Sequence, residues 1–177
     1  GLDLWRSAQM KQAKGDQKGF LADAKLTALT YSYFADQVAQ GKTAAKNLTG
    51  TLSILAQAKL AGGEVDEAEK IFDLVVKADA GSPDANAGLA RIAQAKKDYR
   101  NAVELWTTVE SVSNDSDNLW YEAKYNVAII YLAQGRKMDG CAKFRGTRTE
   151  HPSLGSPEML AKWNAAQRKF CLDGKGT

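Results

Sequence analysis

The chain has 177 residues, 44% of them hydrophobic, which is enough for one compact domain or one short solenoid with a continuous core. Its 24 Lys and Arg residues nearly balance 21 Asp and Glu residues, and a formal net charge of +3 is too small to indicate nucleic-acid binding. The sequence contains no run of about 18 apolar residues, the length that a membrane-spanning helix needs.

Apolar residues recur at helical spacing along almost the whole chain. Pro83, Pro152 and Pro157 all lie where this periodicity breaks. Ser82 before Pro83 and Ser156 before Pro157 have the order of an N-cap followed by a proline at the first helical position. We therefore expect an all-α protein with helices near 3–14, 18–39, 43–61, 65–79, 83–95, 99–112, 118–134, 137–150 and 157–172.

Residues 1–48 contain an apolar stripe at helical spacing, formed by Phe20, Ala24, Ala28, Tyr31, Phe34 and Val38. An amphipathic helix of this kind needs a partner to cover its apolar face. Residues 1–48 do not follow the spacing of the later segments, so we interpret them as degenerate helices that form an N-terminal hairpin.

From residue 49 on, one residue pattern recurs with a period of about 34 residues, and a third copy follows at a slightly longer distance because "NDSD" lengthens the connection. Small residues in the first and second helix of each copy let the helices approach closely, and an aromatic residue fills the space between adjacent hairpins. The three sets are Ala56, Ala68 and Phe72, then Ala90, Ala102 and Trp106, then Ala128, Gly140 and Phe144.

The second helices, "DEAEKIFDLVV", "RNAVELWTTVE" and "MDGCAKFRGTR", together with this period, resemble the tetratricopeptide repeat (TPR) family across residues 49–152. The first helices lack the family's usual Trp and Gly, and Ala80 and Asn114 stand where a proline commonly ends a repeat. The segment "LWYEAKYNVAIIYLAQGRK" followed by "HPSLGSP" resembles divergent repeats of bacterial multi-TPR envelope proteins.

The resemblance implies a right-handed superhelix, or solenoid, of antiparallel helix hairpins, with TPR-like repeats at 49–82, 83–116 and 121–154. The segment "PEMLAKWNAAQRKFC" places Leu160, Trp163 and Phe170 on one face and predicts a capping helix at 157–172. We expect residues 1–177 to form a single α-solenoid domain.

In the TPR family, the first helix of each hairpin lines a concave groove that commonly holds an extended peptide or a helix of a partner. The alignment places there Ser53, Gln57, Leu60, Ala87, Arg91, Gln94, Tyr125, Ile129 and Leu132. The apolar spacing of Tyr125, Ile129 and Leu132 would suit a hydrophobic peptide or an amphipathic helix. The sequence leaves open whether the capping helix or the N-terminal helix already covers these three residues.

The sequence offers no arrangement typical of catalysis, and we expect neither an enzyme nor a cofactor. His151, the single histidine, lies in the segment "EHPSLG", which we interpret as a surface turn. One histidine and two cysteines that lie far apart in the sequence do not form the ligand pairs of a zinc site.

Cys141 belongs to the second helix of the third repeat, and Cys171 ends the capping helix that should cover the same repeat. A disulfide between them would pin the capping helix, stabilise the fold by about 2–4 kcal/mol and imply an oxidising compartment. Two buried free thiols are the alternative. We expect a periplasmic or other extracytoplasmic location if the bridge forms, and a cytoplasmic location otherwise.

We interpret the chain as a non-catalytic protein-protein interaction scaffold that binds a peptide or helix of a partner, and not nucleic acid. The alternatives are an accessory or oligomerisation subunit of an enzyme or envelope complex, or a structural spacer within a longer repeat protein. Self-association is also open. The chain begins with Gly1 and shows no signal peptide, so we expect a mature protein or an excised fragment.

Overall fold

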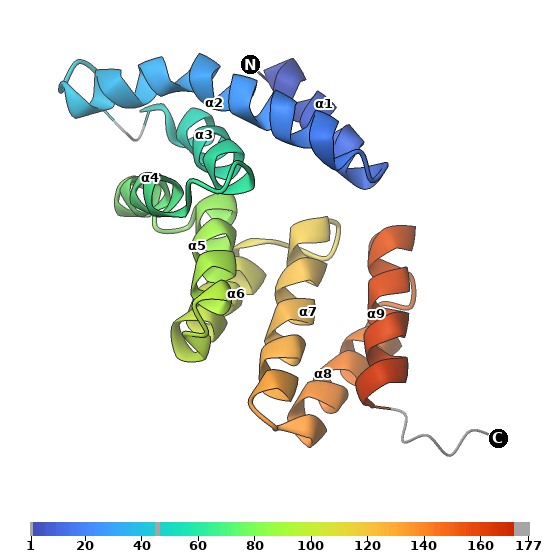
Figure 1. The fold of residues 1–177 in the computed structure, drawn as a ribbon. Coiled ribbons are helices and arrows are strands. Elements are labelled where there is room, and N and C mark those ends of the chain that lie inside the picture. The colour runs from blue at the N-terminus through green and yellow to red at the C-terminus, as the bar shows by residue number, and fades with distance from the viewer. Residues whose placement is uncertain (1, 45–46, 172–177) are drawn as a thin grey trace. The chain divides into compact units, whose positions relative to one another are not determined.

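The computed structural model describes residues 2–44 and 47–171, and within these ranges the protein is all-α (Figure 1). The predicted fold class is confirmed. Except for the start of the third helix, the helices agree with the predicted ranges to within two residues, and the predicted end of the ninth helix at residue 172 lies outside the described residues. In chain order they are α1 (Leu2–Ala13), α2 (Gln17–Ala39), α3 (Thr49–Ala61), α4 (Val65–Ala78), α5 (Pro83–Ala95), α6 (Tyr99–Val112), α7 (Asn118–Ala133), α8 (Lys137–Glu150) and α9 (Pro157–Phe170).

The predicted start of the third helix at residue 43 is wrong, because α3 begins at Thr49. After α2, Gly41 adopts a left-handed conformation with φ of +68°, which a continuing helix does not allow. The amide of Lys42 donates to the carbonyl of Gln37 at 2.9 Å, and the amide of Gly41 donates to Val38 at 3.0 Å. These two bonds form the turn that closes a helix at its C-terminus, so residues just after Gly41 end α2 and do not start α3.

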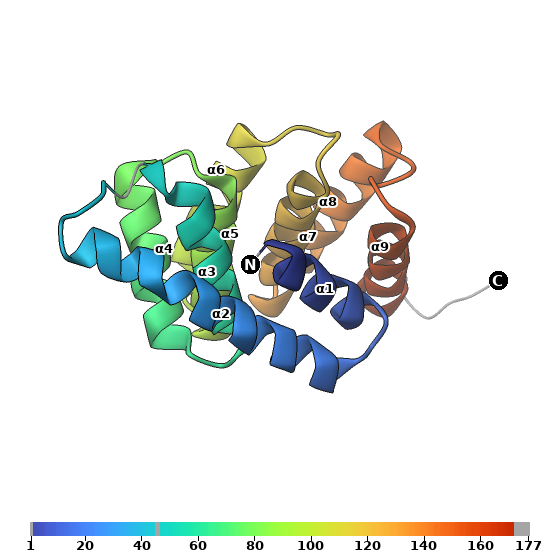
Figure 2. The same cartoon turned by 90° about the horizontal axis from the view of Figure 1, so that it is seen from above.

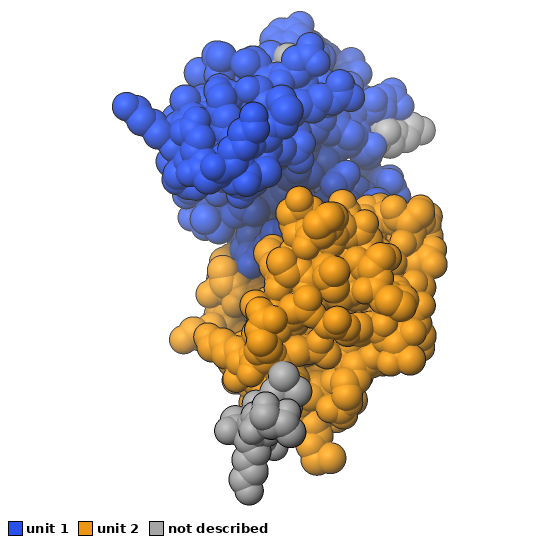
Figure 3. Space-filling model, turned by 90° about the vertical axis from the view of Figure 1, so that its right-hand side faces the viewer, with its two compact units in different colours: residues 1–92 blue, residues 93–177 orange. Residues whose placement is uncertain are grey.

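The structure divides into two compact units, unit 1 with residues 1–92 and unit 2 with residues 93–177, which Figure 3 colours separately. Each unit is described by itself below. The arrangement of residues 1–177 as a single solenoid domain stays a prediction.

In unit 1, the hairpin of α1 and α2 packs on α3 (Figures 1 and 2). The buried core residues of this contact come from all three helices and are Trp5, Ala8, Phe20, Ala24, Ala28, Leu55 and Ala58. The first part of the predicted N-terminal stripe therefore lies in this core, with Phe20, Ala24 and Ala28 buried and Tyr31 packed against them. Further along the chain, Phe72 of α4 is fully buried and lies against Gly88 of α5.

In unit 2, α7, α8 and α9 share one core, to which α7 contributes Tyr121 and Ala128, α8 contributes Phe144 and α9 contributes Met159, Trp163 and Ala166. The rings of Phe144 and Trp163 meet edge to face, with centroids 4.9 Å apart. The segment between α8 and α9 adds Leu154 to this core. The aromatic residue of the third repeat thus packs against the capping helix, as the pattern predicts.

The turn between the first and second helix of each repeat uses the same backbone conformation. Gly63, Lys97 and Gly135 all have positive φ, at +87°, +62° and +77°. Gly63 and Lys97 are equivalent positions of successive repeats, so the repeat period appears in the backbone even where the residue type differs. Lys97 adopts there a conformation that glycine accepts with less strain.

Candidate functional site

The predicted groove positions of unit 1 differ in exposure. Ser53 on α3 is 3% exposed and Ala87 on α5 is fully buried, whereas Gln57, Leu60 and Arg91 are half-buried. The Gln57 side chain donates a 3.3 Å hydrogen bond to the Asp84 carboxylate. In this unit, Gln57, Leu60 and Arg91 are therefore the groove positions with surface that a partner could touch.

In unit 2, the predicted positions Tyr125, Ile129 and Leu132 on α7 are half-buried and pack against the core that α9 completes. The ring of Tyr125 lies 5.7 Å from Phe144 and 6.2 Å from Trp163, centroid to centroid. Burial raises the pKa of Tyr125 above its ordinary value. Within unit 2, the core to which the capping helix belongs covers part of each of these three side chains and leaves the rest of each accessible.

Gln94, the remaining predicted position in unit 2, is half-buried near the end of α5. Its side-chain oxygen accepts a 3.3 Å hydrogen bond from the indole nitrogen of Trp106 on α6. Because Trp106 is fully buried, its indole N–H needs a hydrogen-bond acceptor inside the protein, and Gln94 supplies one.

An ionic cluster links three helices of unit 2. Glu110 of α6 accepts hydrogen bonds from Lys124 of α7 at 2.7 Å and from Lys143 of α8 at 3.1 Å. Burial by itself would raise the pKa of Glu110, but the hydrogen bond from Lys124 and the charge of Lys143 outweigh it and lower the pKa. Lys124 also lies 4.3 Å from the ring centroid of Trp120. Glu110, Lys124 and Lys143 each have an oppositely charged partner within the protein, which suits a structural role for the cluster.

His151 follows α8 in the connection to α9 and is half-buried. Its Nδ1 lies 3.6 Å from the carboxylate of Asp115, and its ring lies edge to face against Trp120 and Tyr121. The sequence suggested a surface turn at His151. The structure adds that its ring packs against the rings of Trp120 and Tyr121.

A pocket in unit 1 lies at the middle of α2 and reaches the end of α3. It has a volume of about 260 Å³ and is lined by Lys25, Ala28, Leu29, Ser32, Lys59 and Glu64. Lys59 donates to Glu64 at 2.9 Å and to Glu67 at 2.6 Å. Burial by itself would lower the pKa of Lys59, but its hydrogen bonds to Glu67 and Glu64 raise it, so this cation is already neutralised by its neighbours.

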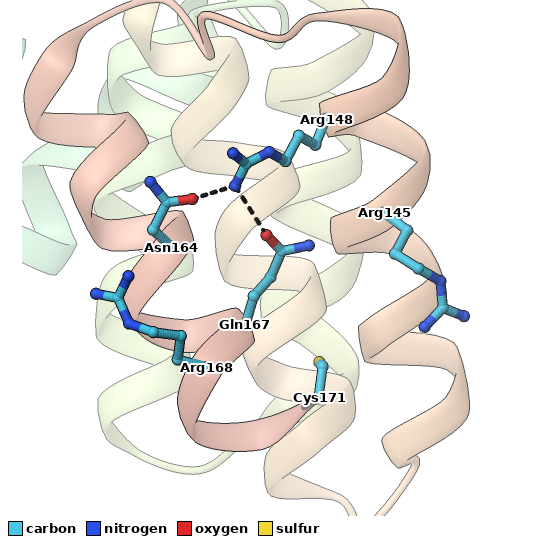
Figure 4. A pocket seen from close by; sticks show the side chains of 6 residues that line it. All are labelled: Arg145, Arg148, Asn164, Gln167, Arg168 and Cys171. Atoms are coloured by element: carbon cyan, nitrogen blue, oxygen red, sulfur yellow. Dashed lines mark hydrogen bonds between the residues drawn. The ribbon is translucent and has the colours of Figure 1, made fainter. Parts of the chain in front are cut away.

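A second pocket, of about 200 Å³, lies between α8 and α9 and was not found from the sequence (Figure 4). Its lining is rich in guanidinium and amide groups and consists of Arg145, Arg148, Asn164, Gln167, Arg168 and Cys171. We call it the arginine pocket. The available signal was the spacing of Arg145 with Arg148 and of Asn164 with Gln167, each three residues apart and therefore on one helix face.

A disulfide joins Cys141 of α8 to Cys171 after α9, with their Cα atoms 5.6 Å apart. This is one of the two states that the sequence left open. At its other end, α9 begins as predicted, with the hydroxyl of Ser156 accepting a 3.2 Å hydrogen bond from the amide of Met159 and Pro157 in the first turn. The capping helix is thus fixed at both ends.

Within residues 2–44 and 47–171, no group of three or more His, Cys, Asp or Glu side chains is arranged to hold a metal ion. None of the helices described in those ranges combines the length and apolarity needed to cross a membrane.

No family model matches the chain, and no curated protein matches it. Solved structures do match. The chain aligns over 94% of its length with a crystal structure of Podosopora anserina kinesin light chain nearly identical TPR-like repeats, at a TM-score of 0.60 and 19% identity, covering 86% of that chain. A Q17M structure of the same protein gives a TM-score of 0.61 at 18% identity, with the same coverage. The MamA protein aligns with 97% of this chain and 96% of its own, at a TM-score of 0.54 and 14% identity.

These likenesses define the class of fold, an all-α repeat built from helix hairpins. The fold is a divergent TPR-type fold, in agreement with the period and the buried positions of the sequence.

Proposed function

We propose that the chain is a non-catalytic scaffold that binds a partner protein. The observation that carries the proposal is the TPR-type fold over nearly the whole chain. Hairpin repeats present extended helix faces to solvent, and such faces suit the binding of a peptide or a helix.

The proposed contact positions are those groove residues that keep accessible surface. In unit 1 they are Gln57, Leu60 and Arg91, and in unit 2 they are Gln94, Tyr125, Ile129 and Leu132. Ser53 and Ala87 are buried and would act by keeping the helices close rather than by touching the partner.

The test is affinity capture from a lysate of the source organism, with bound proteins identified by mass spectrometry. Arg91→Glu reverses a charge on the proposed face, whereas Arg100→Glu makes the same change on α6 at an arginine whose side chain is 91% exposed. We expect wild type and Arg100→Glu to retain a partner that Arg91→Glu loses, with equal helicity by circular dichroism. Equal capture by all three proteins would contradict the groove, and capture of nothing by the wild type would contradict the scaffold.

Self-association is a second candidate, favoured by one observation on α2. Leu26, Leu29 and Tyr33 are 48%, 72% and 62% exposed, and their spacing places them on one face of the helix. Sedimentation velocity over a concentration series should then show a dimer that Leu29→Glu abolishes. Met138→Glu, at an 85% exposed residue of α8, is the matched control. A monomer at every concentration would contradict this candidate.

The disulfide between Cys141 and Cys171 supports an oxidising, extracytoplasmic compartment, because such bonds persist where thiols are not kept reduced. Protein taken from its source cells, quenched in acid and alkylated in denaturant without reductant, should carry no label on either cysteine. Two labels would contradict the proposed compartment.

A further inference from the structure

Positive charge is concentrated in the last two helices. Between Lys137 and Cys171 there are seven Lys and Arg residues against three Asp and Glu residues, an excess larger than the +3 of the whole chain. Part of this charge is neutralised locally, since Lys143 bonds to Glu110. The rest lies on exposed parts of α8 and α9, and three of its arginines line the arginine pocket (Figure 4).

The three arginines have no carboxylate partner among the residues that the structure describes. Elsewhere, Arg6, Arg100 and Arg136 each pair with an acidic residue three or four positions away on or next to their own helix. Arg148 instead donates from Nη1 to the side-chain oxygens of Asn164 and, at 3.2 Å, of Gln167. These amides hold the guanidinium in place without neutralising it, because a neutral amide carries no compensating charge.

The two walls of the arginine pocket are held together covalently and by packing. The disulfide fixes Cys171 to α8, and Phe144 packs edge to face on Trp163 of α9. A site whose walls are already in place loses less conformational entropy on binding than one that must be assembled.

We propose that the arginine pocket binds an acidic segment of a partner protein, with carboxylates of that segment pairing with Arg145, Arg148 and Arg168. Figure 4 shows the guanidinium of Arg148 between the walls, with those of Arg145 and Arg168 to either side of it. Because the three guanidinium groups lie on different sides of the pocket in that view, several carboxylates spaced along a peptide suit them better than one small anion. No aromatic side chain is among the lining residues described, so the pocket lacks the aromatic platforms on which proteins that bind single-stranded nucleic acid commonly stack bases.

The inference rests on the proposed role in protein binding but places a contact outside the groove of the first helices.

The experiment measures fluorescence anisotropy with a short labelled peptide that has Glu at every second position, in about 0.15 M salt, where long-range attraction is screened. Its Gln counterpart is the neutral control peptide.

Two triple variants distinguish binding at the arginine pocket from general electrostatic attraction between the protein and the peptide. Arg145→Gln, Arg148→Gln and Arg168→Gln remove the pocket charges, whereas Lys14→Gln, Lys18→Gln and Lys25→Gln remove the same net charge from unit 1. We expect the arginine triple to weaken binding of the Glu peptide about tenfold, since each exposed ion pair contributes modestly, and the lysine triple to weaken it less than about twofold. Circular dichroism checks that both variants keep wild-type helicity.

Equal losses in the two triples, or no binding of the Glu peptide to the wild type, would overturn the proposal. Displacement of the peptide by inorganic phosphate at equal affinity, or tighter binding of a labelled single-stranded oligonucleotide, would also overturn it. If the Glu peptide fails to bind but the wild type still captures a partner from lysate, the scaffold function stands and only this site falls. If the Glu peptide binds and its binding depends on the three arginines, but the wild type captures no partner from lysate, the result supports the arginine pocket as a binding site and contradicts the scaffold function.

Discussion

The ring of Phe72 on α4 occupies the space that a side chain at residue 88 on α5 would need. A Cβ atom at Gly88 would overlap the far end of this ring, and because Phe72 is fully buried, the ring could move aside only by displacing other core side chains. The close approach of α4 and α5 therefore depends on both residues together.

Gly88→Ala should destabilise the protein. Alanine by itself favours a helix by about 1 kcal/mol over glycine, but overpacking of a filled core costs about 1–3 kcal/mol, so we expect a net loss of up to about 2 kcal/mol in urea unfolding. Shortening the ring with Phe72→Leu in the Gly88→Ala background should recover part of that loss, which a double-mutant cycle measures. A gain in stability for Gly88→Ala would contradict the packing described here.

Gly140→Ala should also destabilise, because a Cβ at this position would lie 2.8 Å from both the carbonyl oxygen of Ala128 and Cγ of Leu132. An overpacking cost of about 1–3 kcal/mol, less the helix preference of alanine of about 1 kcal/mol, gives a net loss of up to about 2 kcal/mol. The backbone carbonyl cannot move aside as a flexible side chain could. Gly146 lies on the same helix, α8, and a Cβ there would meet nothing within 4 Å. Gly146→Ala should therefore stabilise by about 0.5–1 kcal/mol, and thermal unfolding of the two variants compares them directly. Shifts of the same sign would contradict the close approach of α7 and α8.

Glu110→Gln should cost about 1 kcal/mol at neutral pH and progressively less in acid. The folded state lowers the pKa of Glu110 from 4.5, so the stability that this carboxylate contributes is present above 4.5 and is lost as pH falls through the lowered value. We expect the difference between wild type and variant in urea unfolding to shrink between pH 7 and about pH 3. Glu104→Gln, on the same helix and paired only with the exposed Arg100, should show little difference at either pH. A constant difference for Glu110→Gln would show that its charge is not the cause.

Reduction of the disulfide should lower the free energy of unfolding by about 2–4 kcal/mol, because the bond closes a segment of 30 residues in the unfolded chain. Thermal unfolding with and without reductant measures the loss. The variant Cys141→Ala with Cys171→Ala should unfold at the temperature of the reduced wild type and should not respond to reductant. An equal unfolding temperature for oxidised and reduced wild type would contradict a stabilising bridge.

Much of this fold could be predicted from the sequence because its determinants are local. Helical periodicity located the helices, and the three repeat aromatics Phe72, Trp106 and Phe144 are all fully buried. The predicted start of α3 was too early because the Lys and Ala residues after Gly41 favour a helix, whereas the turn at Gly41 ends α2 and α3 begins at Thr49.

The candidate sites were harder to predict because they depend on how helices rotate against one another. Ser53 and Ala87 are equivalent positions of successive repeats, and both prove to be buried, so this position lies on the packed side of its helix. The arginine pocket combines residues from α8 and α9, and the disulfide and the packing of Trp163 set how these two helices align. Periodicity placed Trp163 on the apolar face of the capping helix but does not give the alignment of α9 against α8.

The bond between Cys141 and Cys171 also has a mechanical consequence. When tension is applied through the two ends of the chain, the force passes across the disulfide, and the residues between the cysteines do not carry it. Full extension of the oxidised protein should therefore be shorter by about 100 Å than that of the reduced protein, since about 30 residues contribute about 3.5 Å each. Under load, the redox state of one cysteine pair thus sets how far this protein can stretch.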